Sequence, residues 1–180
     1  MIIGKDVRLR AMERSDLPLF VSWFADPDVR EFLTTRSLYS MSFEEGWYEN
    51  MLKVPIENHP MMIDILVDNQ WLPVGDIALP EINWINRQAE VGVMIGEKAY
   101  WNRGFGTQAM RLMLHYAFDT INLNRVYLEV YEPNIRGIHC YEKAGFIKEG
   151  CLREAQYLNG KYVNVWMMGI LKSEWQQVKE

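Results

Sequence analysis

Two glycines at the start of a predicted helix are the residues whose spacing points most directly to chemistry. Gly104 and Gly106 lie within the stretch AYWNRGFGTQAMRLMLHYAF, and an apolar run with helical spacing follows them at once. Glycine has no Cβ, so the backbone N–H groups beside it stay accessible. Because the N-terminus of a helix carries unpaired N–H groups and a partial positive charge, it attracts anions. The stretch therefore predicts a seat for an anionic group.

Two kinds of phosphate ligand compete for this seat. Gly104, Gly106 and Ala109 formally match the Gly-x-Gly-x-x-Gly/Ala fingerprint of dinucleotide-binding folds. That fingerprint should directly follow the first strand of a βαβ unit, with an acidic residue about twenty positions later. Here antiparallel hairpins come first, residues 96–103 separate the strand from the first glycine, and residues 122–124 read Asn-Leu-Asn. The context argues against a dinucleotide.

The diphosphate of coenzyme A fits the same residues better. It needs several amides that point the same way, with no Cβ in the path, at a positive helix end. The segment NRGFGT supplies both glycines together with the cationic side chain of Arg103 and the hydroxyl of Thr107. The sequence therefore favours an acyl-CoA site.

The glycine segment also resembles motif A of the GNAT N-acetyltransferases, whose usual pattern is Arg/Gln-x-x-Gly-x-Gly/Ala. Trp101 departs from that pattern, which leaves a side-chain contact to phosphate from this position in question. The segment YEPNIRGIHCYEKAGFIKEG, residues 131–150, resembles motif B of the family. The later YLNGKYVNVWMMGILKSEW is similar to the C-terminal hairpin of the RimJ/RimL-like and spermidine N-acetyltransferase branch. The resemblance extends from Val7 to Trp175.

This resemblance implies an enzyme that transfers an acetyl group from acetyl-CoA to a primary amine, by direct attack in a ternary complex. It implies that two neighbouring strands splay apart and that the backbone of residues 93–95 (Val93, Met94 and Ile95) pairs with the pantetheine arm. The other residues that it implies for the cofactor belong to motifs A and B. They are Trp101, Asn102, Arg103, Gly104, Phe105, Gly106, Thr107, Asn134, Tyr141 and Lys143.

Two side chains are predicted to manage the protons of this reaction. A lysine-like amine, with a pKa of about 10.4, arrives as ammonium and must lose a proton. Glu90 is the candidate base, but a carboxylate with a pKa of about 4.3 favours a water relay or an orienting role over simple abstraction. Tyr141 is the candidate general acid, because the departing thiolate has a parent pKa of about 8.5. The structural alternatives are a salt-bridged Glu90 and a core Tyr141.

The amine acceptor is left open by the sequence. Aromatic and acidic side chains of the N-terminal half could form a cation-attracting wall. These candidates are Trp23, Glu31, Glu44, Glu45, Trp47 and Glu49. They allow a protein N-terminus, a polyamine such as spermidine, or another small amine including an aminoglycoside. The alternative function is a non-catalytic acyl-CoA-binding module that kept the glycine seat and lost the chemistry.

The composition argues against several other classes of protein. A formal net charge of −5 is unlike the basic surface of a nucleic-acid binder. His59, His115 and His139 lack metal-ligand spacing, and two cysteines are too few for a disulfide scaffold. No apolar window approaches the length of a membrane span. We therefore expect a cytoplasmic protein with no metal, nucleic acid or membrane partner. The exposed-looking hairpin and the many aromatic residues suggest a homodimer.

The elements that must position these residues follow from hydrophobic periodicity. The predicted order is β α α β β β α β α β β, with a strand over about 89–95 and a buried helix over about 106–119. This order predicts an α/β fold of a single domain over residues 1–180, with a mixed central sheet flanked by helices. The family resemblance makes that sheet mostly antiparallel and splayed between strands 4 and 5.

Three local signals predict where elements begin and end. Ser42 followed by Glu45 predicts a capping box at the start of the second helix. Gly145 predicts the end of the motif B helix. The pair Asn159-Gly160 predicts a tight hairpin turn.

Overall fold

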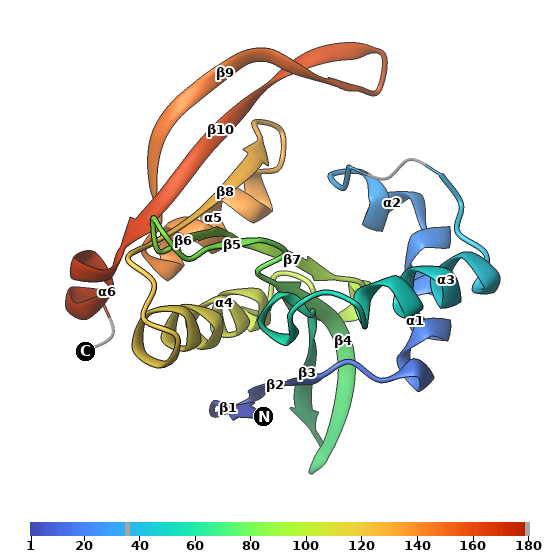
Figure 1. Ribbon diagram of the computed structural model, residues 1–180. Coiled ribbons are helices and arrows are strands. Elements are labelled where there is room, and N and C mark those ends of the chain that lie inside the picture. The colour runs from blue at the N-terminus through green and yellow to red at the C-terminus, as the bar shows by residue number, and fades with distance from the viewer. Residues whose placement is uncertain (35–36, 179–180) are drawn as a thin grey trace.

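Two sheets and the helices around them make up the computed structural model, which describes residues 1–34 and 37–178 (Figure 1). The first sheet is antiparallel throughout and has the strand order β1-β2-β3-β4-β7. Its strands are β1 (Ile2–Ile3), β2 (Val7–Ala11), β3 (Met61–Val67), β4 (Gln70–Ala78) and β7 (Gly92–Ile95). The second sheet has the order β5-β6-β8-β10-β9, in which only the β6–β8 pair is parallel. Its strands are β5 (Ile82–Asn83), β6 (Gln88–Glu90), β8 (Arg125–Tyr131), β9 (Ile147–Leu158) and β10 (Lys161–Leu171).

The two sheets separate at Val91, between β6 and β7. The Val91 N–H donates to the carbonyl of Tyr127 on β8 at 2.8 Å. Beyond that bond β7 pairs with β4 alone, so the described residues contain no strand pairing between β7 and β8. The expected strand over 89–95 is therefore two short strands, one in each sheet. The predicted mixed, mostly antiparallel sheet and its splay are confirmed.

Helices cover both faces of the first sheet. On one side lie α1 (Leu17–Ala25), α2 (Pro27–Arg30) and α3 (Met41–Met51), whose apolar residues pack with Met62 and Met94. On the other side lies α4 (Phe105–His115), which is followed by a π-helical turn (Tyr116–Thr120) and packs on Leu9, Ile63 and Ile65. Because strand residues alternate between faces, neighbouring positions on β3 feed the two separate cores.

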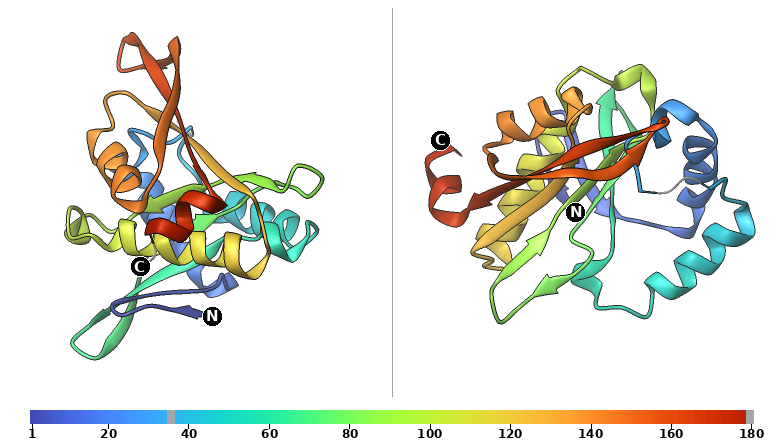
Figure 2. Two further views of the ribbon diagram at one scale, coloured as in Figure 1. Left: turned by 90° about the vertical axis from the view of Figure 1, so that its left-hand side faces the viewer. Right: turned by 90° about the horizontal axis from the view of Figure 1, so that it is seen from above.

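The helix of motif B and the C-terminal hairpin complete the molecule. Helix α5 (Ile135–Ala144) lies beside α4, and α6 (Lys172–Val178) follows β10 (Figure 1). The hairpin of β9 and β10 projects from the body, and its tip reaches toward α2 (Figure 2). There the Asn159 side-chain amide donates to Glu31 Oε1 at 3.3 Å. The hairpin therefore joins two parts of the chain that lie far apart in sequence.

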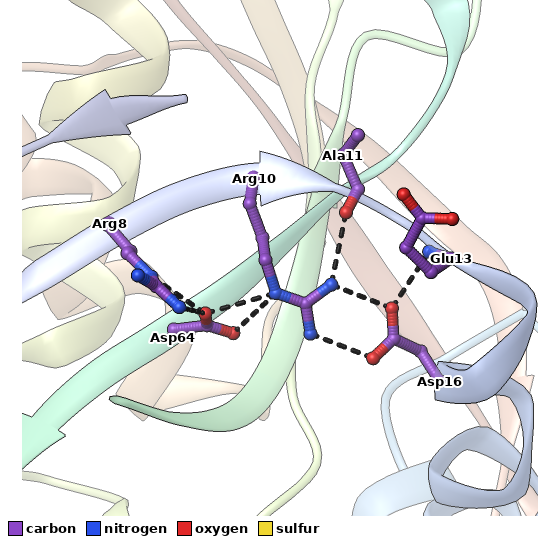
Figure 3. Close-up of polar contacts among 6 residues, drawn as sticks. All are labelled: Arg8, Arg10, Ala11, Glu13, Asp16 and Asp64. Carbon is purple, nitrogen blue, oxygen red and sulfur yellow. Dashed lines mark hydrogen bonds and ion pairs between the residues drawn. The ribbon is translucent and has the colours of Figure 1, made fainter. Parts of the chain in front are cut away.

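A charge network fixes β2 and β3 to the beginning of α1 (Figure 3). Asp64 on β3 is 1% exposed and accepts hydrogen bonds from Arg8 Nε at 2.8 Å and Arg10 Nε at 3.0 Å. Arg10 also donates to both carboxylate oxygens of Asp16, each at 2.8 Å. The Arg8 guanidinium covers the ring of Trp71, with Cζ 4.6 Å from the centroid. Each charge in the network has an opposite partner.

Two of the three boundary signals are confirmed and one is wrong. Gly145 ends α5 with a φ of 108°, and Asn159 and Gly160 form the turn of the hairpin with φ of 47° and 86°. The capping box at Ser42 is wrong, because the N-cap of α3 lies two residues earlier. Ser40 is the N-cap there, and its side chain accepts from the Phe43 N–H at 3.2 Å. Among the described residues, no helix combines the length and the apolarity needed to cross a bilayer.

Candidate active site

A cleft of about 580 Å³ opens where β7 and β8 diverge. Its walls come from β7, the loop that leads into α4, the end of β8, and α5. The structure brings nearly all of the predicted cofactor residues together in these walls. They are Val93, Met94, Ile95, Trp101, Asn102, Gly104, Phe105, Gly106, Thr107, Asn134, Tyr141 and Lys143. Arg103 is not among the lining residues, and its guanidinium lies over the rings of Tyr100 and Phe105 instead.

The start of α4 leaves its first N–H groups without partners. Gly104 is the N-cap, with a left-handed φ of 83°, and no side chain caps the helix. Gln108 makes the first backbone bond of the helix, to the Gly104 carbonyl at 3.1 Å. A Cβ on Gly106 would lie 3.4 Å from Cys140 Sγ, so the glycine lets α4 and α5 approach closely. The uncapped helix end, open toward the cleft, fits a diphosphate.

The strand β7 offers a free edge to the same cleft. One edge pairs with β4, from Gly75↔Ile95 to Ala78↔Gly92. The other edge has no strand partner among residues 1–34 and 37–178. Only at its end is a cleft-side group engaged, where Trp101 Nε1 donates to the Ile95 carbonyl at 2.6 Å. An extended ligand with amide groups can therefore add to β7 as a strand would.

Tyr141 lies on α5, with its side chain half-buried in the wall of the cleft. Burial, with a smaller contribution from Cys140, raises the pKa of Tyr141 above its ordinary value, so the hydroxyl keeps its proton at neutral pH. The start of α5 is fixed by Asn134, whose side chain accepts from the Gly137 N–H at 2.9 Å. Asn134 is thus the N-cap that sets the position of Tyr141 two turns later.

Two carboxylates face the cleft from neighbouring strands. Glu90 ends β6, and Glu129 lies on β8. The pKa of Glu90 is raised, first because the protein removes part of its hydration and second because Glu129 adds repulsion. Glu90 remains accessible to water, which limits this effect. Sequence reasoning missed Glu129, although its polar position between buried Leu128 and Val130 was a signal.

Comparison with known proteins decides the family. The model of the acetyltransferase (GNAT) domain matches residues 6–147. The chain belongs to the GNAT acetyltransferase family. It is 30% identical over 178 residues to a spermidine N(1)-acetyltransferase of Vibrio cholerae, covering 96% of this chain and 97% of the relative. A spermidine N(1)-acetyltransferase of Escherichia coli is 28% identical over 179 residues, covering 94% and 88%.

Solved structures show the same relationship. A crystal structure of the Vibrio cholerae spermidine N-acetyltransferase, in complex with CoA and spermine, has a TM-score of 0.87 at 28% identity. It covers 96% of this chain and 99% of its own. This GNAT protein is therefore an N-acetyltransferase with acetyl-CoA as co-substrate, as the sequence predicts. The spermidine part of the resemblance is confirmed, whereas these relatives give no support to the RimJ/RimL-like part.

The expected cation-attracting wall of this GNAT enzyme needs correction. Trp23 is 5% exposed and lies beneath β7, where a Cβ on Gly96 would fall 2.2 Å from its ring. It is a core residue and does not line the cleft. Glu45 and Trp47 lie on the exposed side of α3, outside the cleft lining. The helical period of α3 alone could not show which of its faces turns toward the cleft.

The N-terminal wall of the cleft is instead mostly apolar. It comes from α2 and the segment that follows it, and it consists of Val29, Phe32, Leu33 and Thr34. Glu31 lies beside it, exposed, and accepts the hydrogen bond from the hairpin tip. Sequence reasoning named Glu31 but none of the four residues of this wall.

Proposed function

We propose that this GNAT enzyme acetylates a polyamine, with spermidine as the model acceptor, by direct attack of a primary amine on acetyl-CoA in a ternary complex. The observation that carries the proposal is the polarity of the cleft. Unpaired N–H groups of α4 lie at the end of β7, and the carboxylates of Glu90 and Glu129 lie before its beginning. An anionic co-substrate and a polycationic acceptor are attracted to opposite ends of one cleft. The named activity of the two spermidine relatives supports the same acceptor class.

The amine must lose a proton before it attacks. Glu90 takes that proton through water, and its raised pKa reduces the difference between its own pKa and that of the ammonium group. The amine nitrogen then attacks the acetyl carbonyl carbon, and a C–N bond forms as the C–S bond breaks. Backbone N–H groups on the free edge of β7 stabilise the oxyanion. Glu129 adds negative charge that holds the cationic acceptor near Glu90.

The leaving thiolate must gain a proton. Tyr141 lines the cleft with its hydroxyl protonated at neutral pH, so it is available as the donor. The thiolate accepts this proton, and the tyrosine recovers it from solvent. Asn134 caps α5 and so positions the tyrosine.

An acetyl-CoA consumption assay, followed by release of free thiol, tests the proposal. The substrates are spermidine, spermine, aminoglycosides, other small amines and peptides with a free N-terminus. Turnover should be highest with the polyamines. Turnover confined to peptides or aminoglycosides would contradict the acceptor class. Binding of acetyl-CoA with no turnover on any amine would support the non-catalytic acyl-CoA-binding module instead. A homodimer and a cytoplasmic location stay predictions, and sedimentation velocity tests the first.

A further inference from the structure

The helix end that fits the diphosphate lacks a cation from its own loop. Its contacts are backbone N–H groups, and a diphosphate carries more negative charge than a helix N-terminus offsets. Arg103 is the arginine of that loop, but it does not line the cleft, because its guanidinium lies over the rings of Tyr100 and Phe105, at 5.3 and 5.6 Å from their centroids. A second cation therefore has to come from another element.

Arg136 on α5 meets this requirement. It lines the cleft, and its Cζ lies 3.6 Å from the centroid of the Trp101 ring, a close face-on stack. The indole is itself held by its bond to the Ile95 carbonyl, at 2.6 Å. One chain of contacts thus runs from the end of β7 through Trp101 to the guanidinium. Stacking uses the face of a guanidinium and leaves its N–H donors available.

The electrostatic surroundings of Arg136 favour an anionic ligand. The described residues contain neither an ion pair nor a hydrogen bond to its side chain. Partial burial lowers the pKa of Arg136, and the charge of Glu31 offsets part of that effect. Arg136 is exposed, so its guanidinium stays charged, and no counter-ion among the described residues is bonded to it. A bound phosphate would supply one.

We propose that Arg136, stacked on Trp101, binds the diphosphate of coenzyme A and supplies the side-chain cation that the motif A loop lacks. Trp101 is then a positioning residue, which replaces a direct phosphate contact by holding the arginine of the neighbouring helix. A planar fork of N–H donors can bind two phosphate oxygens at once. This inference rests on the proposed function, because it takes the N-terminus of α4 as the site of the coenzyme A diphosphate.

Titration calorimetry on the full chain tests the role of Arg136. The ligands are CoA, dephospho-CoA, which keeps the diphosphate, and 4′-phosphopantetheine, which has one phosphate. Arg136→Gln should weaken CoA and dephospho-CoA alike, by about tenfold or more, as expected for loss of a charge-assisted hydrogen bond. The loss for 4′-phosphopantetheine should be smaller. Arg136→Lys should be intermediate. Arg153→Gln, on exposed β9 outside the cleft, is the charge-matched control and should bind like the wild type.

Each outcome has a distinct meaning. Unchanged CoA affinity in Arg136→Gln would overturn the inference. A loss for CoA but not for dephospho-CoA would move the contact to the 3′-phosphate and would also overturn it. If the wild type itself fails to bind CoA, the proposed function fails first. A merely structural role would lower the melting temperature and weaken all three ligands equally.

A double-mutant cycle tests the role of Trp101. In a Trp101→Leu background, the further change Arg136→Gln should weaken CoA binding only slightly, because the guanidinium has already lost the ring on which it stacks. Trp101→Phe keeps an aromatic face without the N–H donor, so its CoA affinity should lie between those of the wild type and Trp101→Leu. The apparent KM for acetyl-CoA should rise in each variant with little change in kcat, since the reacting carbonyl is elsewhere. Fully additive losses would exclude Trp101 as the positioning residue.

Discussion

Two regions of the molecule gather charged side chains, and they differ in whether those charges have partners within the fold. In the network on β2, β3 and α1, Asp64 receives two guanidinium groups and Asp16 receives one of them (Figure 3). In the cleft, Glu90 faces a second carboxylate and Arg136 has an aromatic ring rather than an anion. The first region has used its bonding capacity within the fold. The second has kept its capacity for ligands, so an unmet partner marks function here better than burial does.

A third site on the same sheet face sharpens the contrast. Arg10, Met62, Asp76 and Met94 are paired directly across β2, β3, β4 and β7. Arg10 is thus two strands from Asp76, about 10 Å away, with the buried Met62 between them. Burial, together with the charge of Glu44 on α3, raises the pKa of Asp76 to about 7. Glu44 is 3% exposed, and its Oε1 has no hydrogen-bond partner among the residues that the structure describes.

Asp16 shows what a counter-ion changes. Burial alone would raise its pKa, but the hydrogen bonds from Arg10 and from the Glu13 backbone lower it below the ordinary value. Asp76 lies on the same face without such a donor, and its pKa moves in the opposite direction. Burial is common to both aspartates, so the guanidinium decides the sign.

The largest expected effect comes from breaking the paired network. Asp64→Ala should lower the free energy of unfolding by about 3–5 kcal/mol, because it removes the carboxylate partner of Arg8 and leaves Arg10 with Asp16 alone. Urea denaturation measures this as a lower midpoint with an unchanged m-value. Asp64→Asn, which keeps the shape and one of the two acceptor oxygens, should lose less. Acetyl transfer per folded molecule should be unaffected, and a loss under about 1 kcal/mol would mean that the network is not stabilising.

Removal of a cleft hydroxyl should act on rate and not on stability. Tyr141→Phe should reduce kcat by about tenfold or more, because general acids contribute up to roughly 10²–10⁴-fold to the rate. CoA affinity and the melting temperature should stay at wild-type values, because the ring remains in the wall. Tyr162→Phe, exposed on the hairpin, is the matched control. Wild-type turnover in Tyr141→Phe would remove the tyrosine from the mechanism.

The carboxyl groups of Asp76 and Glu44, which repel each other and have no cationic partner among the described residues, should make the free energy of unfolding depend on pH. The pKa of Asp76 is about 7 in the folded state against 3.8 for the free side chain, so the folded protein binds the extra proton between these values. Stability should therefore fall as pH rises from about 4 to 7. Asp76→Asn should flatten this pH dependence and raise the free energy of unfolding by about 2 kcal/mol at pH 8. That is about half of what the whole pKa shift would give, because the site is partly accessible. Thermal unfolding across pH measures both, and a slope unchanged by the substitution would contradict this assignment.

The smallest expected effect is at the proposed base. Glu90→Gln should lower kcat with spermidine by about tenfold, because water remains as a weaker acceptor. The wild-type pH–rate profile should show an acid limb above the ordinary pKa of a glutamate, since burial and Glu129 raise the pKa of Glu90. That limb should vanish in Glu90→Gln. Glu129→Gln should instead move it to lower pH and raise the KM for the polyamine. An acid limb that survives in Glu90→Gln belongs to another group.

The sequence by itself determined the local parts of the site. Gly104 and Gly106 predicted the seat because glycine has no Cβ to cover the backbone N–H groups beside it. Gly145 and the Asn159-Gly160 turn were predicted because Gly, and to a lesser degree Asn, adopts a left-handed φ. Except for Arg103, the predicted residues of motifs A and B line one cleft, since each set lies close together in sequence on one loop or one helix.

Only the tertiary structure decided the partners across elements. It placed Glu129 beside Glu90 through the parallel register of β6 and β8, and Arg136 on Trp101 through the approach of α5 to the motif A loop. It also put Trp23 in the core beneath β7. Strand register and helix rotation are set by long-range packing, which short-range spacing does not encode. Short stretches of sequence therefore supply the functional side chains, and the tertiary fold decides which of those side chains lack a partner within the protein.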